Sequence, residues 1–108
     1  MANMKHTPKT YAQAVEALNG RDSVKLGNNT WLIDCDDYIA VRLHNTHIVK
    51  FYSGGLVTLH TGGFYSVTTK SRMNQFIRAN VYQRAHQWYV CLADGVEVIF
   101  SEGLDVSA

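Results

Sequence analysis

The sequence predicts an α+β fold, in which one bent antiparallel sheet of about six or seven strands packs with two short helices. Three observations support this prediction. The chain has 108 residues, 46% apolar and 11% aromatic, which suits one modest core. Short β-rich runs alternate with turn residues along most of it, and two stretches instead show apolar residues at helical spacing. We expect one domain over 1–108, with 1–9 flexible.

The first predicted helix covers residues 10–19. Thr10 and Gln13 can form a capping box at its start. Asn19-Gly20 is typical of a helix end. The apolar positions between them recur at helical spacing, at Tyr11, Ala14, Val15 and Leu18.

A meander of antiparallel strands is predicted next. Each of its β-rich runs is bounded by Gly, Asn, Asp or Ser. The runs are Val24–Leu26, Trp31–Asp34, Tyr38–His44, His47–Tyr52 and Leu56–His60. Alternation along the third run points Val41 inward and Arg42 outward. A tight turn at Asn45-Thr46 would then place His47 beside His44.

The last part of the chain predicts a short strand, a second helix and a hairpin. The strand is Phe64–Val67, and Thr68 or Thr69 can cap the helix that follows. The apolar side of that helix is formed by Met73, Phe76 and Ile77, and it should end near Ala79-Asn80.

Two strands, Trp88–Ala93 and Val96–Phe100, complete the predicted sheet. Asp94-Gly95 between them is the preferred dipeptide of a two-residue type I′ turn. Pairing across such a turn would place one set of side chains on a common face: Tyr89, Cys91, Val98 and Phe100. Both faces of the hairpin are apolar, so we expect both to be covered.

Charge is distributed unevenly along the chain. From Tyr38 to Ala93 there is no Asp or Glu, although the formal net charge of the whole chain is only +1. The same stretch contains six basic side chains, namely Arg42, Lys50, Lys70, Arg72, Arg78 and Arg84. A basic body with acidic flanks predicts an anionic partner.

Two groups of residues suggest how such a partner could bind. A helix start surrounded by Thr68, Thr69, Lys70 and Arg72 can hold a phosphate on its free N–H groups. An exposed polar cap with solvated charges is the alternative. The outward side of the third and fourth runs combines Arg42 and Lys50 with Tyr52, and Tyr65 follows in the sequence. Basic groups beside aromatic rings suit single-stranded nucleic acid, although packing also explains the aromatics.

Catalytic and metal sites are weakly indicated. His44, His47 and His60 with Cys35 or Asp34 match no zinc signature. The acidic group Asp34, Asp36 and Asp37 could bind a divalent cation, but a turn explains it as well. No Ser-His-Asp or Cys-His arrangement is recognisable. We therefore expect a non-enzymatic protein with no cofactor and no metal.

Cysteine usage and hydropathy indicate the setting. Cys35 and Cys91 are too few for a disulfide framework, which predicts a reduced environment and two small core residues. No apolar run is long enough to cross a membrane, and the N-terminus shows no secretion signal.

One segment resembles a family of small uncharacterised bacteriophage proteins. Its distinctive part is the double glycine Gly62-Gly63, an aromatic residue, and then Thr-Thr-Lys-x-Arg at 68–72. Val41–Thr46, Trp88–Val90 and Asp94-Gly95 fit the same pattern, so the resemblance spans about residues 27–103. It implies a phage origin and an accessory role in the cytoplasm of the infected bacterial host, but it assigns no activity and no site residue.

These observations predict a phage accessory protein that binds DNA, RNA or a nucleoprotein through a basic face. The residues predicted to form that face are Arg42, Lys50, Lys70, Arg72, Arg78, Tyr52, Tyr65, Thr68 and Thr69. The alternative is a phage-encoded inhibitor of a host enzyme or defence complex, with a role in anti-defence or host takeover. No membrane is expected as a partner. A homodimer stays open, because edge strands in a small sheet can pair.

Overall fold

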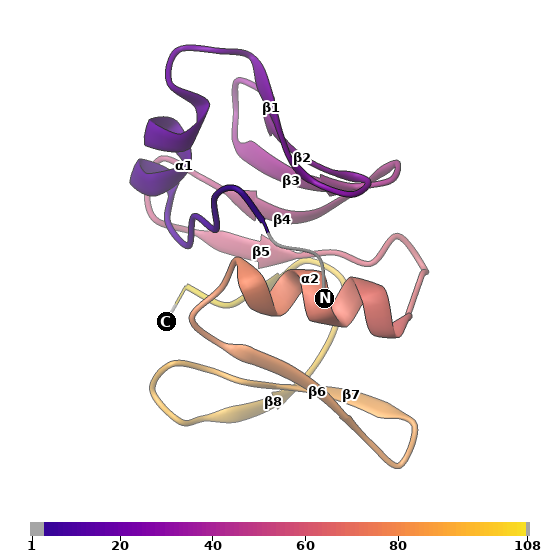
Figure 1. Ribbon diagram of the computed structural model, residues 1–108. Helices are drawn as coiled ribbons and strands as arrows, with labels where there is room; N and C mark the ends of the chain where they lie inside the picture. Colours follow the sequence, from indigo (N-terminus) through magenta and orange to yellow (C-terminus); the bar gives the residue numbers. More distant parts are fainter. Residues whose placement is uncertain (1–3, 108) are drawn as a thin grey trace.

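The computed structural model describes residues 4–107 and shows an α+β domain with two antiparallel sheets (Figure 1). The larger sheet has the order β1-β2-β3-β4-β5-β9, and the smaller sheet has the order β6-β7-β8. Helix α1 packs on β1, β2 and β3, whereas α2 packs on both β4 and β6. Figure 1 shows α2 between the two sheets, with the smaller sheet at one end of a molecule that measures 42 × 28 × 21 Å.

The larger sheet is a meander completed by the end of the chain. Its strands are β1 (Ser23–Gly27), β2 (Thr30–Asp34), β3 (Ile39–Leu43), β4 (Thr46–Phe51), β5 (Val57–Leu59) and β9 (Leu104–Asp105). The smaller sheet consists of β6 (Asn80–Arg84), β7 (Gln87–Cys91) and β8 (Glu97–Ile99). Because β9 pairs with β5, the chain returns to the larger sheet after it leaves the smaller one.

Both helices are capped by side chains. Helix α1 (Tyr11–Leu18) begins after Thr10, whose hydroxyl accepts from the backbone N–H of Gln13, and ends at Asn19, which has a left-handed φ of 50°. This helix was predicted correctly. Helix α2 (Val67–Gln75) begins after Ser66, whose hydroxyl accepts from the N–H of Thr69. The predicted cap at Thr68 or Thr69 was therefore wrong, and the expected strand at 64–67 does not form.

The core lies between the inner face of the larger sheet, the two helices and the inner face of the smaller sheet. Val41, Val49 and Leu59 point inward from three neighbouring strands and are fully buried. Met73 and Phe76 close the core from α2 and from the turn that follows it. Side chains from both sheets form one apolar cluster, which makes the two sheets parts of one domain.

The N-terminal segment is attached to this core where it is described. The backbone N–H of Lys5 donates to the carbonyl of Leu26 at 2.9 Å, and Pro8 is buried. Lys5 and Pro8 therefore contact the rest of the domain, the flexibility expected for residues 1–9 stays a prediction, and residues 1–3 lie outside the described residues.

The final hairpin has a different register from the predicted one. Its loop has three residues, because Leu92 donates to Val96, and Gly95 within the loop has a φ of 91°. The register pairs Tyr89 with Ile99 and Val90 with Val98. Since one extra loop residue exchanges the two faces of a strand, the predicted grouping of Tyr89 with Val98 was wrong.

Two further strands and the separation of the sheets were not predicted. Strand β6 follows α2 after the connection 76–79 and pairs with β7, and the short β9 forms the far edge of the larger sheet. The hairpin expected to be covered on both faces instead lies in a separate three-stranded sheet with one open face. The α+β class and the single domain are confirmed, with nine strands in the described residues.

Candidate functional site

The outer face of the larger sheet carries polar and aromatic side chains around the apolar residues Ile33 and Ala40. The register pairs Leu32 with Val41 and Val41 with Val49, all of which are buried. Their sequence neighbours therefore point to the opposite side of the sheet. We call this side the basic sheet face, and define it by Lys25, Trp31, Tyr38, Arg42, His47, Lys50, Tyr52 and His60.

A β-bulge in β4 sets which residues reach this face. Arg42 pairs with His47 while Val41 pairs with Val49, so Ile48 is an extra residue and is buried. Lys50 consequently pairs with Ala40 and faces outward. The predicted turn at Asn45-Thr46 was displaced by one residue, because Leu43 pairs with Thr46, and His47 therefore faces Arg42 rather than His44.

The centre of the basic sheet face is a cluster of rings and cations. The Nζ atom of Lys50 lies 4.7 Å from the ring centroid of Tyr38, as in a cation–π contact. The ring of Tyr52 lies 5.5 Å from that of Tyr38, tilted by 51°. The hydroxyl of Tyr38 is 3.2 Å from Nδ1 of His47. Trp31 extends the face toward β1, because it pairs with Arg42 on one side and Lys25 on the other.

Positive charge on this face is not neutralised by carboxylates. In residues 4–107 the structure has one salt bridge, Arg84 to Glu97, which lies in the smaller sheet. The Nε–H group of Arg42 is buried and has no hydrogen-bond partner among the described residues. Neither the guanidinium of Arg42 nor the ammonium of Lys50 therefore has a carboxylate partner among the described residues.

Burial and the positive charges of this face both lower the pKa of two histidines, His47 and His60. Burial lowers the pKa of His47 below its usual value, and Lys50 and Arg42 lower it further. Burial also lowers the pKa of His60, and Lys50 adds to the effect more strongly than Glu102 opposes it. Both imidazoles are therefore neutral at pH 7, and an anion bound beside them would favour their protonation.

Acidic side chains lie at the β5–β9 edge of the basic sheet face. Asp105 of β9 pairs with Thr58 of β5 on the outer side of the sheet. Glu102 lines a shallow cleft together with His47, Lys50 and His60. A polyanion that binds this face would thus be directed over β2, β3 and β4 and away from the β9 edge.

The predicted site at the start of α2 lies on the other side of the larger sheet. Arg72 is buried in the last turn of the helix, where its Nε donates to the hydroxyl of Thr30 at 3.1 Å. It therefore cannot meet a phosphate at the surface, and its assignment to the first turn was wrong. Its position in the last turn complements the helix dipole. Thr69 is also buried, and its hydroxyl lies 3.0 Å from that of Ser66.

The remaining predicted residues are dispersed. Lys70 faces the smaller sheet, with its ammonium 5.5 Å from the ring of Trp88, and Thr68 is exposed on α2. Tyr65 packs edge-on against Trp88 with ring centroids 5.0 Å apart. Arg78 is exposed in the connection after α2. Of the nine predicted residues, the structure thus brings three together on one face: Arg42, Lys50 and Tyr52.

The double-glycine motif has a structural role that the sequence did not reveal. The carboxylate of Glu102 accepts hydrogen bonds from the backbone N–H of Thr61 at 2.7 Å, from that of Gly62 at 3.0 Å and from the hydroxyl of Thr61 at 2.8 Å. The hydroxyl of Tyr65 is a fourth donor, at 3.3 Å. We call this group the Glu102 latch, because it fastens the loop before α2 to the connection between β8 and β9.

Backbone conformation and the approach of Thr46 explain why glycine stands at position 62. Gly62 has a φ of 63°, and a Cβ there would lie 3.0 Å from Cγ2 of Thr46. Partial burial favours a raised pKa for Glu102, but the hydrogen bonds from Thr61, Gly62 and Tyr65 outweigh it and hold that pKa below its usual value. Glu102 is therefore ionised at pH 7.

Groups that could hold a metal are not assembled in the described residues. No three side chains of His, Cys, Asp or Glu in residues 4–107 are placed to share an ion. Asp34 accepts from the backbone N–H of Asp36 at 3.0 Å, so the acidic group forms a turn between β2 and β3. Cys35 and Cys91 are both free and half-buried.

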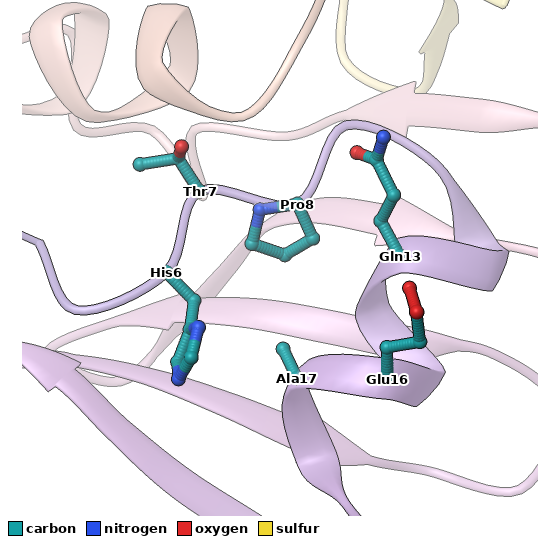
Figure 2. A pocket seen from close by; sticks show the side chains of 6 residues that line it. All are labelled: His6, Thr7, Pro8, Gln13, Glu16 and Ala17. Carbon is teal, nitrogen blue, oxygen red and sulfur yellow. The ribbon is translucent and has the colours of Figure 1, made fainter.

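A second hollow lies between the N-terminal segment and α1 (Figure 2). Figure 2 shows Gln13 and Glu16 projecting from the helix, whereas His6 comes from the segment that precedes it. Its other lining residues are Thr7, Pro8 and Ala17. Since no Lys or Arg lines it, this hollow is less suited to an anion than the basic sheet face.

Comparison with known proteins identifies the family. A family model described as the Kyanoviridae Gp96 protein matches residues 7–107. The chain belongs to this family. Membership confirms the expected phage origin, and it carries no activity with it. No curated protein and no solved structure matches the chain.

The family match extends over both sheets and both helices. It therefore includes the basic sheet face and the Glu102 latch. Within residues 4–107, neither helix has the length and apolar character needed to cross a membrane.

Proposed function

We propose that this Kyanoviridae Gp96 family protein binds single-stranded nucleic acid, free or within a nucleoprotein, through the basic sheet face. The observation that carries the proposal is the cluster of Tyr38, Tyr52 and Lys50 on the outer face of the larger sheet, with Arg42 on the same face. Within residues 4–107, no carboxylate is paired to either cation. Aromatic rings on which bases stack and cations that follow the backbone are the two parts of a single-strand site.

Each side chain has a distinct part in this proposal. Arg42 and Lys50 meet phosphates, while Tyr38, Tyr52 and Trp31 offer ring faces to bases. Each such stacking contact contributes about 1–3 kcal/mol by alanine substitution. The role is non-enzymatic, requires no cofactor and belongs to the cytoplasm of the infected host.

Single strands fit this face better than a duplex does. Proteins that read a duplex mainly insert a helix or a β-ribbon into a groove. The rings of the basic sheet face instead lie on the surface of a sheet, on neighbouring strands. Bases that are already unpaired can reach Tyr38 and Tyr52 without the cost of opening a helix.

The proposal is tested by fluorescence anisotropy with labelled single-stranded and duplex DNA and RNA over a salt series. Lys50→Ala and Arg42→Ala should each weaken binding to every sequence and reduce the salt slope by about one. Tyr38→Ala should weaken binding about 5-fold or more with little change in slope. Arg78→Ala is the matched control, because Arg78 is an exposed cation outside the face.

A protein inhibitor is the second candidate function. An apolar cleft between the β3–β4 turn and α2 favours it, because Leu43 and Ile48 line that cleft and Phe64 at its rim is 67% exposed. A host enzyme or defence complex could dock a side chain there. Phe64→Ala should abolish capture of such a partner and leave nucleic-acid binding unchanged, whereas Lys50→Ala should have the opposite pattern.

A further inference from the structure

The open face of the smaller sheet carries exposed apolar side chains. Across its three strands, Tyr82 pairs with Tyr89 and Tyr89 pairs with Ile99, so the three form one row. The two tyrosine rings stack with centroids 5.8 Å apart and an angle of 23°. Ile99 is 62% exposed. We call these residues, with Arg84 and Glu97, the small-sheet face.

One cation and one anion accompany this row. The guanidinium of Arg84 lies 4.5 Å from the ring centroid of Tyr89 and reaches Glu97 across the face at 3.3 Å. Both charged side chains are largely exposed, at 60% and 44%, so their mutual attraction is weak in water. The face therefore presents both signs of charge in equal number around an apolar centre.

This balance favours a protein over a nucleic acid as the partner. The single arginine of the face is already paired with Glu97, and Asp94 follows in the adjacent loop, so phosphates would meet carboxylates there. The aliphatic side chain of Ile99 offers bases no stacking surface. An apolar row with a polar rim is instead typical of a protein interface.

We propose that the partner is a second copy of this chain, bound with twofold symmetry through the small-sheet face. In a twofold interface the same patch meets itself, so the patch must be complementary to its own charges. Arg84 of one copy can pair with Glu97 of the other, and the reverse pair forms at the same time. The rows of Tyr82, Tyr89 and Ile99 then lie against each other and are removed from water.

The arrangement leaves the nucleic-acid site free. The smaller sheet lies at one end of the molecule, and the larger sheet extends from the other side of α2 (Figure 1). A dimer formed at that end would carry two basic sheet faces. Strands of five, five and three residues present less than the about 800 Å² per partner of a standard interface, so we expect a weak dimer.

Sedimentation equilibrium of the full chain, from micromolar to submillimolar concentration, tests this proposal. The wild type should dimerise within this range, and Ile99→Lys should weaken dimerisation about tenfold or more. Val67→Lys is the matched control, because Val67 is an exposed aliphatic residue on α2, outside the face, and should leave dimerisation unchanged. Circular dichroism of each variant confirms that the fold is retained.

A charge exchange tests the twofold geometry itself. Arg84→Glu alone and Glu97→Arg alone each leave a face with like charges and should weaken the dimer, whereas the two changes together should restore it. A monomer at all concentrations, or a dimer that survives Ile99→Lys, would overturn the proposal. So would a monomer whose affinity for single-stranded RNA or DNA falls with Arg84→Glu, because the face would then bind nucleic acid.

Discussion

Removal of the Glu102 carboxylate should destabilise this protein more than its surface position suggests. Glu102 itself is exposed, but the Thr61 that it binds is fully buried. In Glu102→Ala the backbone N–H and the hydroxyl of Thr61 both lose their acceptor. The other two donors, from Gly62 and Tyr65, belong to exposed residues and can turn to water.

The size of the effect follows from the two buried donors. A buried donor left without a partner costs about 1–3 kcal/mol, so two give at least about 2 kcal/mol. For a domain of this size, 1 kcal/mol corresponds to about 4–8 °C, so the melting temperature should fall by about 8–16 °C or more. Glu102→Gln should cost less, because its amide oxygen can still accept from Thr61.

Urea unfolding of the two Glu102 variants and the wild type measures this directly. Glu97→Ala is the matched control, because it removes the same side chain from an exposed salt bridge and should cost less than about 1 kcal/mol. Equal stability of Glu102→Ala and Glu97→Ala would refute the reasoning, since water would then satisfy Thr61 as well as the carboxylate does.

Three further effects are expected. Gly62→Ala should lower the free energy of unfolding by about 1 kcal/mol or more, because the φ of 63° and the 3.0 Å approach to Thr46 both oppose a Cβ. Thermal melts measure this, with Gly54→Ala as the control, because a Cβ at Gly54 would meet nothing within 4 Å. Stability should fall as the pH drops below 6.5, because burial and Lys50 lower the pKa of His47 and His60, so the unfolded chain takes up protons first; urea titrations of His47→Gln with His60→Gln should lose this pH dependence. A second loss should begin below pH 4.5, where protonation of Glu102 favours the unfolded state, and it should be absent in melts of Glu102→Gln.

Elements defined by local signals were predicted well. The cap at Thr10 and the stop at Asn19 lie within one stretch of chain, and α1 matched its prediction. The five strands of the meander were also placed within a residue or two, because turn residues separate them. The cap of α2 was missed because Ser66, Thr68 and Thr69 are equivalent as capping residues, and packing of Thr69 decides between them.

Faces were harder to predict than strands. The loop 93–95 has three residues where Asp94-Gly95 indicated two, and that difference moved Ile99 onto the face of Tyr89. The bulge at Ile48 keeps Val49 buried opposite Val41 and places Lys50 on the outer face. Neither local change has a distinct sequence signature.

The acid-free stretch, residues 38–93, did not indicate where in the fold its basic side chains lie. It passes from the outer face of the larger sheet through α2 to the smaller sheet, so its six cations do not share a surface. Arg72 is buried against Thr30, whereas Lys25 and Trp31, which lie outside the stretch, join Arg42 through strand pairing. The acid-free stretch predicts an anionic partner, but the strand register determines which residues lie together on the outer face.

The most direct test of the central claim is the salt dependence of binding to single-stranded nucleic acid, measured by anisotropy for the wild type, Lys50→Ala, Arg42→Ala and Arg78→Ala. We predict that the wild type binds a single strand more tightly than the duplex of the same sequence, and that only the first two variants reduce the salt slope. No binding at low salt, or an equal loss in Arg78→Ala, would contradict the assignment of the basic sheet face.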